Sequence, residues 1–137
     1  MTILVSRTDS IGDVVLTLPL VGAIKRYLPS SKVIFLGKSY TKAVIELCDD
    51  IDEFLNWDDL RKDLKKAHTV LQNKNINTAI LVFPDKQIAK VCKKAKIKHR
   101  IGTSHRVYNL LYCNRLINFS RRKSNEHEAI LNLKLLN

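Results

Sequence analysis

The residues best suited to carry chemistry follow the first apolar run of the chain. They read Arg7-Thr8-Asp9-Ser10-Ile11-Gly12-Asp13, directly after the strand-like segment 2–6. Asp13 stands where a helical pattern begins, and the partial positive charge of a helix start favours an ionised carboxylate. Such a carboxylate can accept a proton from a hydroxyl group. Aspartate also often caps helices, so spacing alone leaves both roles open for Asp13.

Glycine and the order of the elements also mark this stretch as a ligand site. Gly12 suits a tight turn or a close approach of the backbone to another group. The spacing is not the G-x-G-x-x-G of a dinucleotide fingerprint, which disfavours that class of ligand. Open α/β sheets bind ligands at the loops that follow the carboxyl ends of strands, and this stretch is the first such loop.

The apolar pattern predicts strands alternating with helices over the rest of the chain. Strands are expected over residues 2–6, 32–37, 54–57, 78–83 and 99–102. Helices are expected from 13 to about 28 (with Pro19 kinking or limiting the first turns), and over 41–48, 58–73, 85–95 and 108–116, with another after 124. Asp58 or Asp59 is the expected cap of the helix that ends near Asn73. This alternation predicts an α/β fold with a Rossmann-like, open parallel sheet and flanking helices.

The positive charge is concentrated in one stretch. The chain has 137 residues with 24 basic and 13 acidic side chains, a formal net charge of +11. Half of the basic residues lie between Lys86 and Asn125, where there is no aspartate or glutamate. Such a stretch attracts polyanions such as nucleic acid, anionic lipid or a phosphorylated saccharide, but it also suits an ordinary solvated surface.

Other features narrow the class of protein. No apolar run reaches the roughly 20 residues of a membrane-spanning helix, and the start lacks the pattern of a secretory signal. Three widely spaced cysteines predict neither a disulfide framework nor a zinc site, and they favour a reduced, cytoplasmic location. The histidines show no metal spacing, so no metal site is predicted.

The segment from Ile3 to Pro19, ILVSRTDSIGDVVLTLP, resembles the opening of the bacterial heptosyltransferases of lipopolysaccharide core synthesis, glycosyltransferase family 9. Weaker similarities follow in the same order along the chain. They are residues 23–29 (AIKRYLP), 51–54 (IDEF), 101–102 (IG) and 126–133 (EHEAILNL).

The resemblance implies a GT-B architecture, in which two Rossmann-like domains face a cleft. It also implies an inverting, metal-independent transfer of a sugar from a nucleotide-sugar donor, typically ADP-heptose, with no further cofactor. The aspartate that matches Asp13 is the family's proposed catalytic base. The loop from Thr8 to Gly12 would then shape the acceptor pocket, with Asp9, Ser10 and Ile11 taking part.

The family resemblance also extends to the acceptor and to basic residues that would grip its phosphates. The acceptor is an anionic glycolipid of the lipid A–Kdo type, and the protein would be a cytoplasmic one in peripheral contact with the anionic, cytoplasmic face of the inner membrane. Arg61, Lys62, Arg121 and Arg122 are the candidates for its anionic groups. For Arg61 and Lys62 the alternative is a solvated surface paired with Asp58, Asp59 and Asp63.

On this reading residues 1–137 form the N-terminal, acceptor-binding domain, and the C-terminal donor-binding domain is absent. We therefore expect donor binding to be missing from the chain alone. The alternatives are a non-catalytic α/β domain that binds polyanions or nucleic acid, and a half that pairs with a separate donor-domain chain. Nucleic acid is disfavoured because the basic stretch lacks the aromatic pattern of an RNA-binding sheet, a helix-turn-helix signature and zinc fingers.

Overall fold

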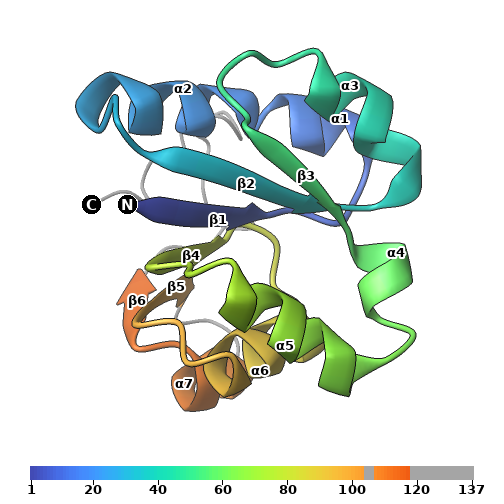
Figure 1. The fold of residues 1–137 in the computed structure, drawn as a ribbon, viewed down its shortest axis with the longest axis vertical. Coiled ribbons are helices and arrows are strands. Elements are labelled where there is room, and N and C mark those ends of the chain that lie inside the picture. The colour runs from blue at the N-terminus through green and yellow to red at the C-terminus, as the bar shows by residue number, and fades with distance from the viewer. Residues whose placement is uncertain (104–106, 118–137) are drawn as a thin grey trace.

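The structure is a computed structural model that describes residues 1–103 and 107–117. Its strands form one open parallel sheet in the order β3-β2-β1-β4-β5-β6 (Figure 1). The strands are β1 (Thr2–Ser6), β2 (Lys32–Gly37), β3 (Glu53–Asn56), β4 (Thr78–Leu81), β5 (His99–Thr103) and β6 (Arg115–Ile117). The predicted α/β class and Rossmann-like parallel sheet are therefore confirmed.

Helices cover both faces of the sheet. The helices before β3 are α1 (Ile11–Val15), α2 (Leu18–Tyr27), the 3₁₀ turn η1 (Ser39–Thr41) and α3 (Lys42–Glu46). The later helices are α4 (Trp57–Leu60), α5 (Leu64–Asn73), α6 (Lys86–Lys94) and α7 (Val107–Tyr112). Figure 1 shows α1, α2 and α3 on one side of the sheet and α5, α6 and α7 on the other.

Alternation along the strands creates two apolar cores. On β1, Ile3 and Val5 pack with residues of α1, α2 and α3, whereas Leu4 packs with residues of α4, α5 and α6. Successive side chains of a strand point to opposite faces, so a strand buried on both faces reads as a continuous apolar run. This is why the uninterrupted apolar segments of β1, β2 and β4 were recognisable in the sequence.

Pro19 ends one helix and begins another. The pattern expected to run from Asp13 to Leu28 is divided into α1 and α2, and Pro19 is the second residue of α2. Proline is tolerated in the first turn of a helix, where no backbone donor is needed. The division leaves α1 as a separate five-residue helix that carries the candidate site.

The helix expected over 58–73 is also two helices, and the predicted cap was wrong. Asn56 caps α4, and Asp63 caps α5 by accepting hydrogen bonds from the backbone N–H groups of Lys65 and Lys66. Asp58 and Asp59 instead lie in the first turn of α4. A side chain that accepts hydrogen bonds from the free N–H groups at a helix start allows a second helix to begin along a new axis. Apolar periodicity alone does not reveal such a cap.

The predicted helix over 108–116 ends early and is followed by a strand. Asn114 stops the helix because its side chain accepts from the N–H of Arg100 (2.7 Å) and donates to the carbonyl of Lys98 (2.6 Å). The following residues then pair with β5 as β6. This strand is short and partly exposed, so it lacks the apolar run that marks the central strands.

The layer beneath β5 is tightly packed around two buried thiols. A methyl group added to Gly102 would lie 2.9 Å from the Asn109 side chain and 3.0 Å from the sulfur of Cys113. Burial raises the pKa of Cys92 to about 12 and that of Cys113 to about 11. Both thiols are free and buried, as expected for cysteines that pack as small apolar side chains.

Candidate active site

The β1–α1 loop lies where the strand order of the sheet reverses. The strands β2 and β4 flank β1 on either side, so the chain moves outward in both directions from this point. The backbone N–H of Arg7 donates to the carbonyl of Leu36 (3.1 Å), and that of Val82 donates to the carbonyl of Ser6 (3.0 Å). The loop is thereby held at the carboxyl edge of the sheet, where open α/β folds bind ligands.

Ser10, not Asp13, caps helix α1. The hydroxyl of Ser10 accepts a hydrogen bond from the Asp13 N–H (3.3 Å) and donates to Oδ2 of Asp13 (2.7 Å). This reciprocal arrangement is a variant of the capping box, in which an acidic side chain at the third helical position turns back to the cap residue. Asp13 therefore lies within the first turn, and its carboxylate is oriented by the cap.

Arg7 opens the predicted stretch but had no role predicted for it, and its buried side chain organises the loop. The Arg7 side chain is 4% exposed and pairs with both carboxylate oxygens of Asp9, at 2.8 and 3.0 Å. Its Nη2 also lies 3.5 Å from Oδ1 of Asp13, and its Nη1 donates to Oγ1 of Thr17 (3.4 Å). A planar guanidinium can serve several acceptors in fixed directions, so Arg7 ties β1, the loop and α1 together.

The residues predicted to shape the acceptor pocket divide into two groups. Thr8 is buried, and Asp9 is held from two sides: Arg7 binds its carboxylate, and the hydroxyl of Tyr40 donates to its backbone carbonyl. Ser10, Ile11 and Gly12 are exposed, and the Asp13 side chain is 37% exposed. The surface that a ligand meets is therefore the first turn of α1, and Thr8 and Asp9 support it from behind.

Gly12 has no conformational reason to be glycine. Its φ angle is not positive, and a methyl group built on it would meet nothing within 4 Å. The tight turn expected at this position is therefore absent, and Gly12 lies inside α1. Of the two uses predicted for Gly12, a close approach of another molecule to the backbone is the one that the open space accommodates.

Apolar side chains surround this turn of α1. Ile11 and Val15, one helical turn apart, are 43% and 44% exposed, and Tyr40 of η1 is 53% exposed. Phe83, whose backbone N–H donates to the carbonyl of Ser6 (3.4 Å), is 38% exposed on the other side of β1. Ring faces and aliphatic carbons at this edge offer apolar contact to a ligand beside the Asp13 carboxylate.

The basic candidates lie elsewhere. Arg61 and Lys62 are exposed directly after α4, beyond β3 at the edge of the sheet, and Lys62 pairs with Asp59 at 3.8 Å. Hydrogen bonds from the backbone and hydroxyl of Ser39 lower the pKa of Asp58 below its usual value. Arg121 and Arg122 lie outside the described residues.

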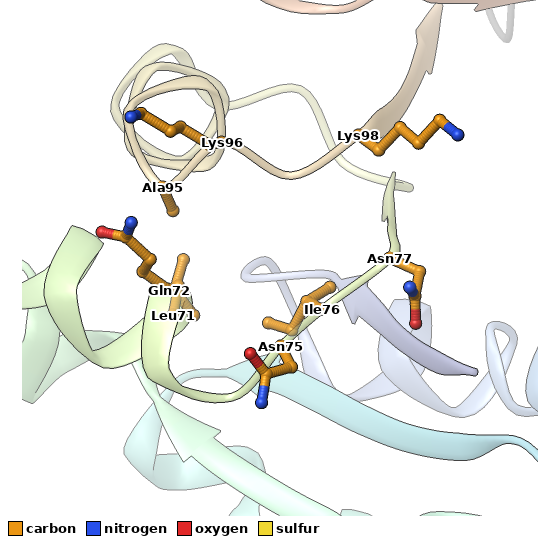
Figure 2. A pocket seen from close by; sticks show the side chains of 8 residues that line it. All are labelled: Leu71, Gln72, Asn75, Ile76, Asn77, Ala95, Lys96 and Lys98. Atoms are coloured by element: carbon orange, nitrogen blue, oxygen red, sulfur yellow. The ribbon is translucent and has the colours of Figure 1, made fainter.

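The described residues hold no group of three or more side chains that could bind a metal ion. The same residues include no helix long and apolar enough to cross a membrane. A cavity of about 370 Å³ lies at the opposite, amino edge of the sheet, between the ends of α5 and α6 (Figure 2). Its lining includes Gln72, Asn75, Asn77, Lys96 and Lys98, so it is separate from the Asp13 loop.

Comparison with known proteins supports the resemblance that the loop suggested. The chain is 28% identical over 136 residues to a Haemophilus influenzae protein named "Putative glycosyltransferase", covering 98% of this chain and 39% of that protein. A solved glycosyltransferase of family 9 from Veillonella parvula matches with a TM-score of 0.83 at 19% identity, over 98% of this chain and 40% of the other. The predicted resemblance to family 9 glycosyltransferases is confirmed.

Two further structures show the same fold in family 9-like enzymes. The Escherichia coli heptosyltransferase WaaC with ADP matches with a TM-score of 0.78 at 18% identity, over 98% of this chain and 46% of that one. The Escherichia coli ADP-heptose heptosyltransferase II matches with a TM-score of 0.78 at 17% identity, over 89% of this chain and 36% of the other. No family model matches the sequence. The chain spans less than half the length of each of these relatives.

Proposed function

We propose that this chain is the acceptor-side part of an inverting, metal-independent glycosyltransferase of the heptosyltransferase type. The observation that carries the proposal is the Asp13 carboxylate, partly exposed at the carboxyl edge of the sheet and held by Ser10 and Arg7. The resemblance to glycosyltransferases over 98% of the chain supports it. The preferred donor is ADP-heptose, because the similar structures include a heptosyltransferase with ADP and an ADP-heptose heptosyltransferase.

Asp13 would act as the general base. An acceptor hydroxyl placed against its exposed oxygen would lose its proton to Asp13 as the hydroxyl oxygen attacks the anomeric carbon of the donor. The new C–O bond forms on the face opposite to the leaving group, and the electron pair of the broken C–O bond leaves with the nucleoside diphosphate. Base catalysis of this kind contributes roughly 10²–10⁴-fold in rate.

Ser10 and Arg7 favour this role because they fix the carboxylate. The Ser10 hydroxyl and the Arg7 guanidinium both interact best with the charged form of Asp13, which keeps it able to accept a proton. They also restrict its rotation, so that the carboxylate need not be ordered when the acceptor arrives. Arg7 and Ser10 are therefore positioning residues in this proposal.

The acceptor in this proposal is an anionic glycolipid. Its sugar ring would rest on the first turn of α1, where Gly12 leaves room beside the backbone and where Ile11 and Phe83 offer apolar contact. Arg61 and Lys62 remain candidates for its anionic groups, together with Arg121 and Arg122. The donor would be bound by a part of the enzyme that matches the remaining length of the relatives, on the same or a separate chain.

The proposal is tested by transfer assays with Asp13→Asn. The chain is combined with a donor-binding part, supplied as the corresponding region of the Haemophilus influenzae relative, and heptose transfer from ADP-heptose to lipid A–Kdo is measured. We expect Asp13→Asn to lower kcat by at least about a hundredfold. Binding of the acceptor, followed by calorimetry on this chain alone, should change little. Full activity of Asp13→Asn would remove the proposed base.

A further inference from the structure

Lysines on and after α6 have no acidic partner among the described residues, a property they share with Lys38, Lys65 and Lys66 but not with five other lysines. Within the described part of the chain, none of the six exposed lysines between positions 86 and 98 pairs with a carboxylate. These six are Lys86, Lys90, Lys93, Lys94, Lys96 and Lys98. By contrast, Lys25, Lys32, Lys42, Lys62 and Lys74 all do so.

The helix geometry arranges part of this charge in a line. Ile88, Ala89, Val91 and Cys92 are buried against the sheet, which turns the lysines of α6 to the outside. Lys86, Lys90 and Lys94 follow at intervals of four residues, so they lie above one another along one face of the helix. Like charges at this spacing repel, and a polyanionic surface would relieve that repulsion.

An exposed leucine lies beside the charged helix. Leu111 of α7 is 63% exposed, and its backbone carbonyl accepts a hydrogen bond from Nζ of Lys93 (3.1 Å). The same Nζ lies 5.8 Å from the centre of the Tyr112 ring. The surface thus combines a row of cations with an apolar side chain, a combination typical of proteins that bind membrane surfaces.

We propose that Lys86, Lys90 and Lys94, together with Leu111, dock this protein on an anionic lipid bilayer. We call these four residues the α6 docking face. A nucleic acid is disfavoured because single strands are held by exposed aromatic rings. Tyr27 and Tyr40 belong to elements on the opposite side of the sheet, and Tyr112 is only partly exposed. Phe83, 38% exposed, gives the start of α6 one ring rather than the row of rings that holds successive bases.

The position of the docking face also suits the proposed acceptor. Helix α6 begins five residues after the last residue of β4, so its first turn lies at the same carboxyl edge of the sheet as the Asp13 loop. Docking through α6 would bring that edge close to glycolipids in the same bilayer. This last point rests on the proposed function, whereas the docking itself follows from the charge and exposure of α6 and α7.

Vesicle binding tests the proposal directly. The full chain is titrated with vesicles of phosphatidylglycerol and phosphatidylcholine, and with vesicles of phosphatidylcholine alone. The triple variant Lys86→Gln, Lys90→Gln, Lys94→Gln should bind the anionic vesicles about a hundredfold more weakly, at about fivefold for each lysine. The matched control Arg26→Gln, Lys32→Gln, Lys42→Gln removes equal charge from exposed basic residues outside the docking face and should change binding less than about threefold.

Four outcomes decide between this surface and its alternatives. Equal loss in the two triple variants would show that net charge alone drives binding and would overturn the docking face. Tighter binding of a single-stranded RNA than of the anionic vesicles, lost in the α6 triple variant, would assign the face to nucleic acid instead. Leu111→Ser should weaken vesicle binding further at high salt, and an unchanged affinity would contradict its insertion. Asp13→Asn should bind vesicles normally, so a failure of the base hypothesis stays separable from a failure of docking.

Discussion

The β1–α1 loop and the outer surface of α6 use charge in opposite ways. In the loop, the buried Arg7 guanidinium lies between the carboxylates of Asp9 and Asp13, and hydrogen bonds fix every partner. On α6, exposed lysines extend outward with no acidic partner among the described residues. The Arg7 network fixes the positions of a few carboxylate atoms, whereas the α6 lysines produce a positive electrostatic potential over the outer surface.

This difference follows from solvent exposure. A charge pair removed from water is strong and directional, and losing one partner leaves the other poorly solvated. Charges in water interact weakly with each neighbour and are screened within about 10 Å at ordinary ionic strength. We therefore expect substitutions in the loop to change folding stability strongly, and substitutions on α6 to change partner binding far more than stability.

The largest effect should come from removing the buried cation. Arg7→Met keeps a long apolar side chain but leaves the Asp9 and Asp13 carboxylates without their guanidinium, so the free energy of unfolding should fall by about 3 kcal/mol. Urea denaturation followed by circular dichroism measures this change. Arg7→Lys should recover part of the loss, because an ammonium group keeps the charge but cannot form the bidentate pair. An unchanged urea midpoint for Arg7→Met would contradict the structural role of these buried ion pairs.

A smaller effect is expected where a charge pair is partly exposed to solvent. Burial raises the pKa of Asp52, but hydrogen bonds from the Lys25 side chain and the Val33 N–H outweigh it, and the net pKa is lowered. Burial likewise raises the pKa of Glu53, and bonds from Lys74 and Lys32 lower it overall. Carboxyl groups with lowered folded pKa values stabilise the fold above their unfolded pKa values. That stability is lost as the pH falls through the lowered folded values.

The dependence of the denaturation midpoint on pH in the acid range therefore tests this effect. Denaturation midpoints should decrease as the pH falls below the ordinary values of 3.8 for Asp52 and 4.5 for Glu53. Lys25→Met should cost about 1 kcal/mol at neutral pH and should make the acid dependence shallower. An identical pH dependence in Lys25→Met and the unsubstituted chain would show that the Lys25–Asp52 pair does not contribute.

Gly12 and Gly22 form a matched pair for separating stability from binding. Both lie in helices, and an added methyl group would meet nothing near Gly12 and only an ordinary 3.7 Å contact near Gly22. Alanine at either position should raise the free energy of unfolding by about 0.5 kcal/mol, because it restricts the unfolded chain. Only Gly12→Ala should weaken acceptor binding, which calorimetry with a lipid A–Kdo acceptor can measure. Equal binding by the two variants would exclude a close approach at Gly12.

The smallest effects should distinguish unpaired from paired surface lysines. Lys90→Gln removes like-charge repulsion on α6 and should raise the free energy of unfolding by about 0.3 kcal/mol. Lys42→Gln removes an exposed pair with Glu46 (3.8 Å) and should lower stability by about 0.3 kcal/mol. Thermal unfolding of the two variants side by side measures the difference. If both variants changed stability in the same direction, ion pairing would not distinguish the lysines of α6 from those of α3.

Local sequence patterns predicted most of the sheet and the location of the candidate site. The apolar runs of β1, β2 and β4 are long because both faces of a central parallel strand are buried. The edge strand β6 was missed because Arg115–Ile117 is short and partly exposed, and the helix over 58–73 was divided by the Asp63 cap. These errors occur where a few side-chain hydrogen bonds outweigh apolar periodicity.

The sequence by itself determined the alternation of the central strands with helices, the loop that carries Asp13, and the concentration of lysines after position 86. These depend on neighbouring residues, whose spacing sets which side chains share a face. Only the tertiary structure decided that Arg7 turns inward between Asp9 and Asp13, that Ser10 caps α1, and that the α6 lysines pair with no described carboxylate. Arg7 and Ser10 lie within six residues of these partners, so the sequence places them close together, but only the burial of the β1–α1 loop decides that the Arg7 side chain points inward. Which carboxylates come within reach of the α6 lysines depends on which elements fold side by side.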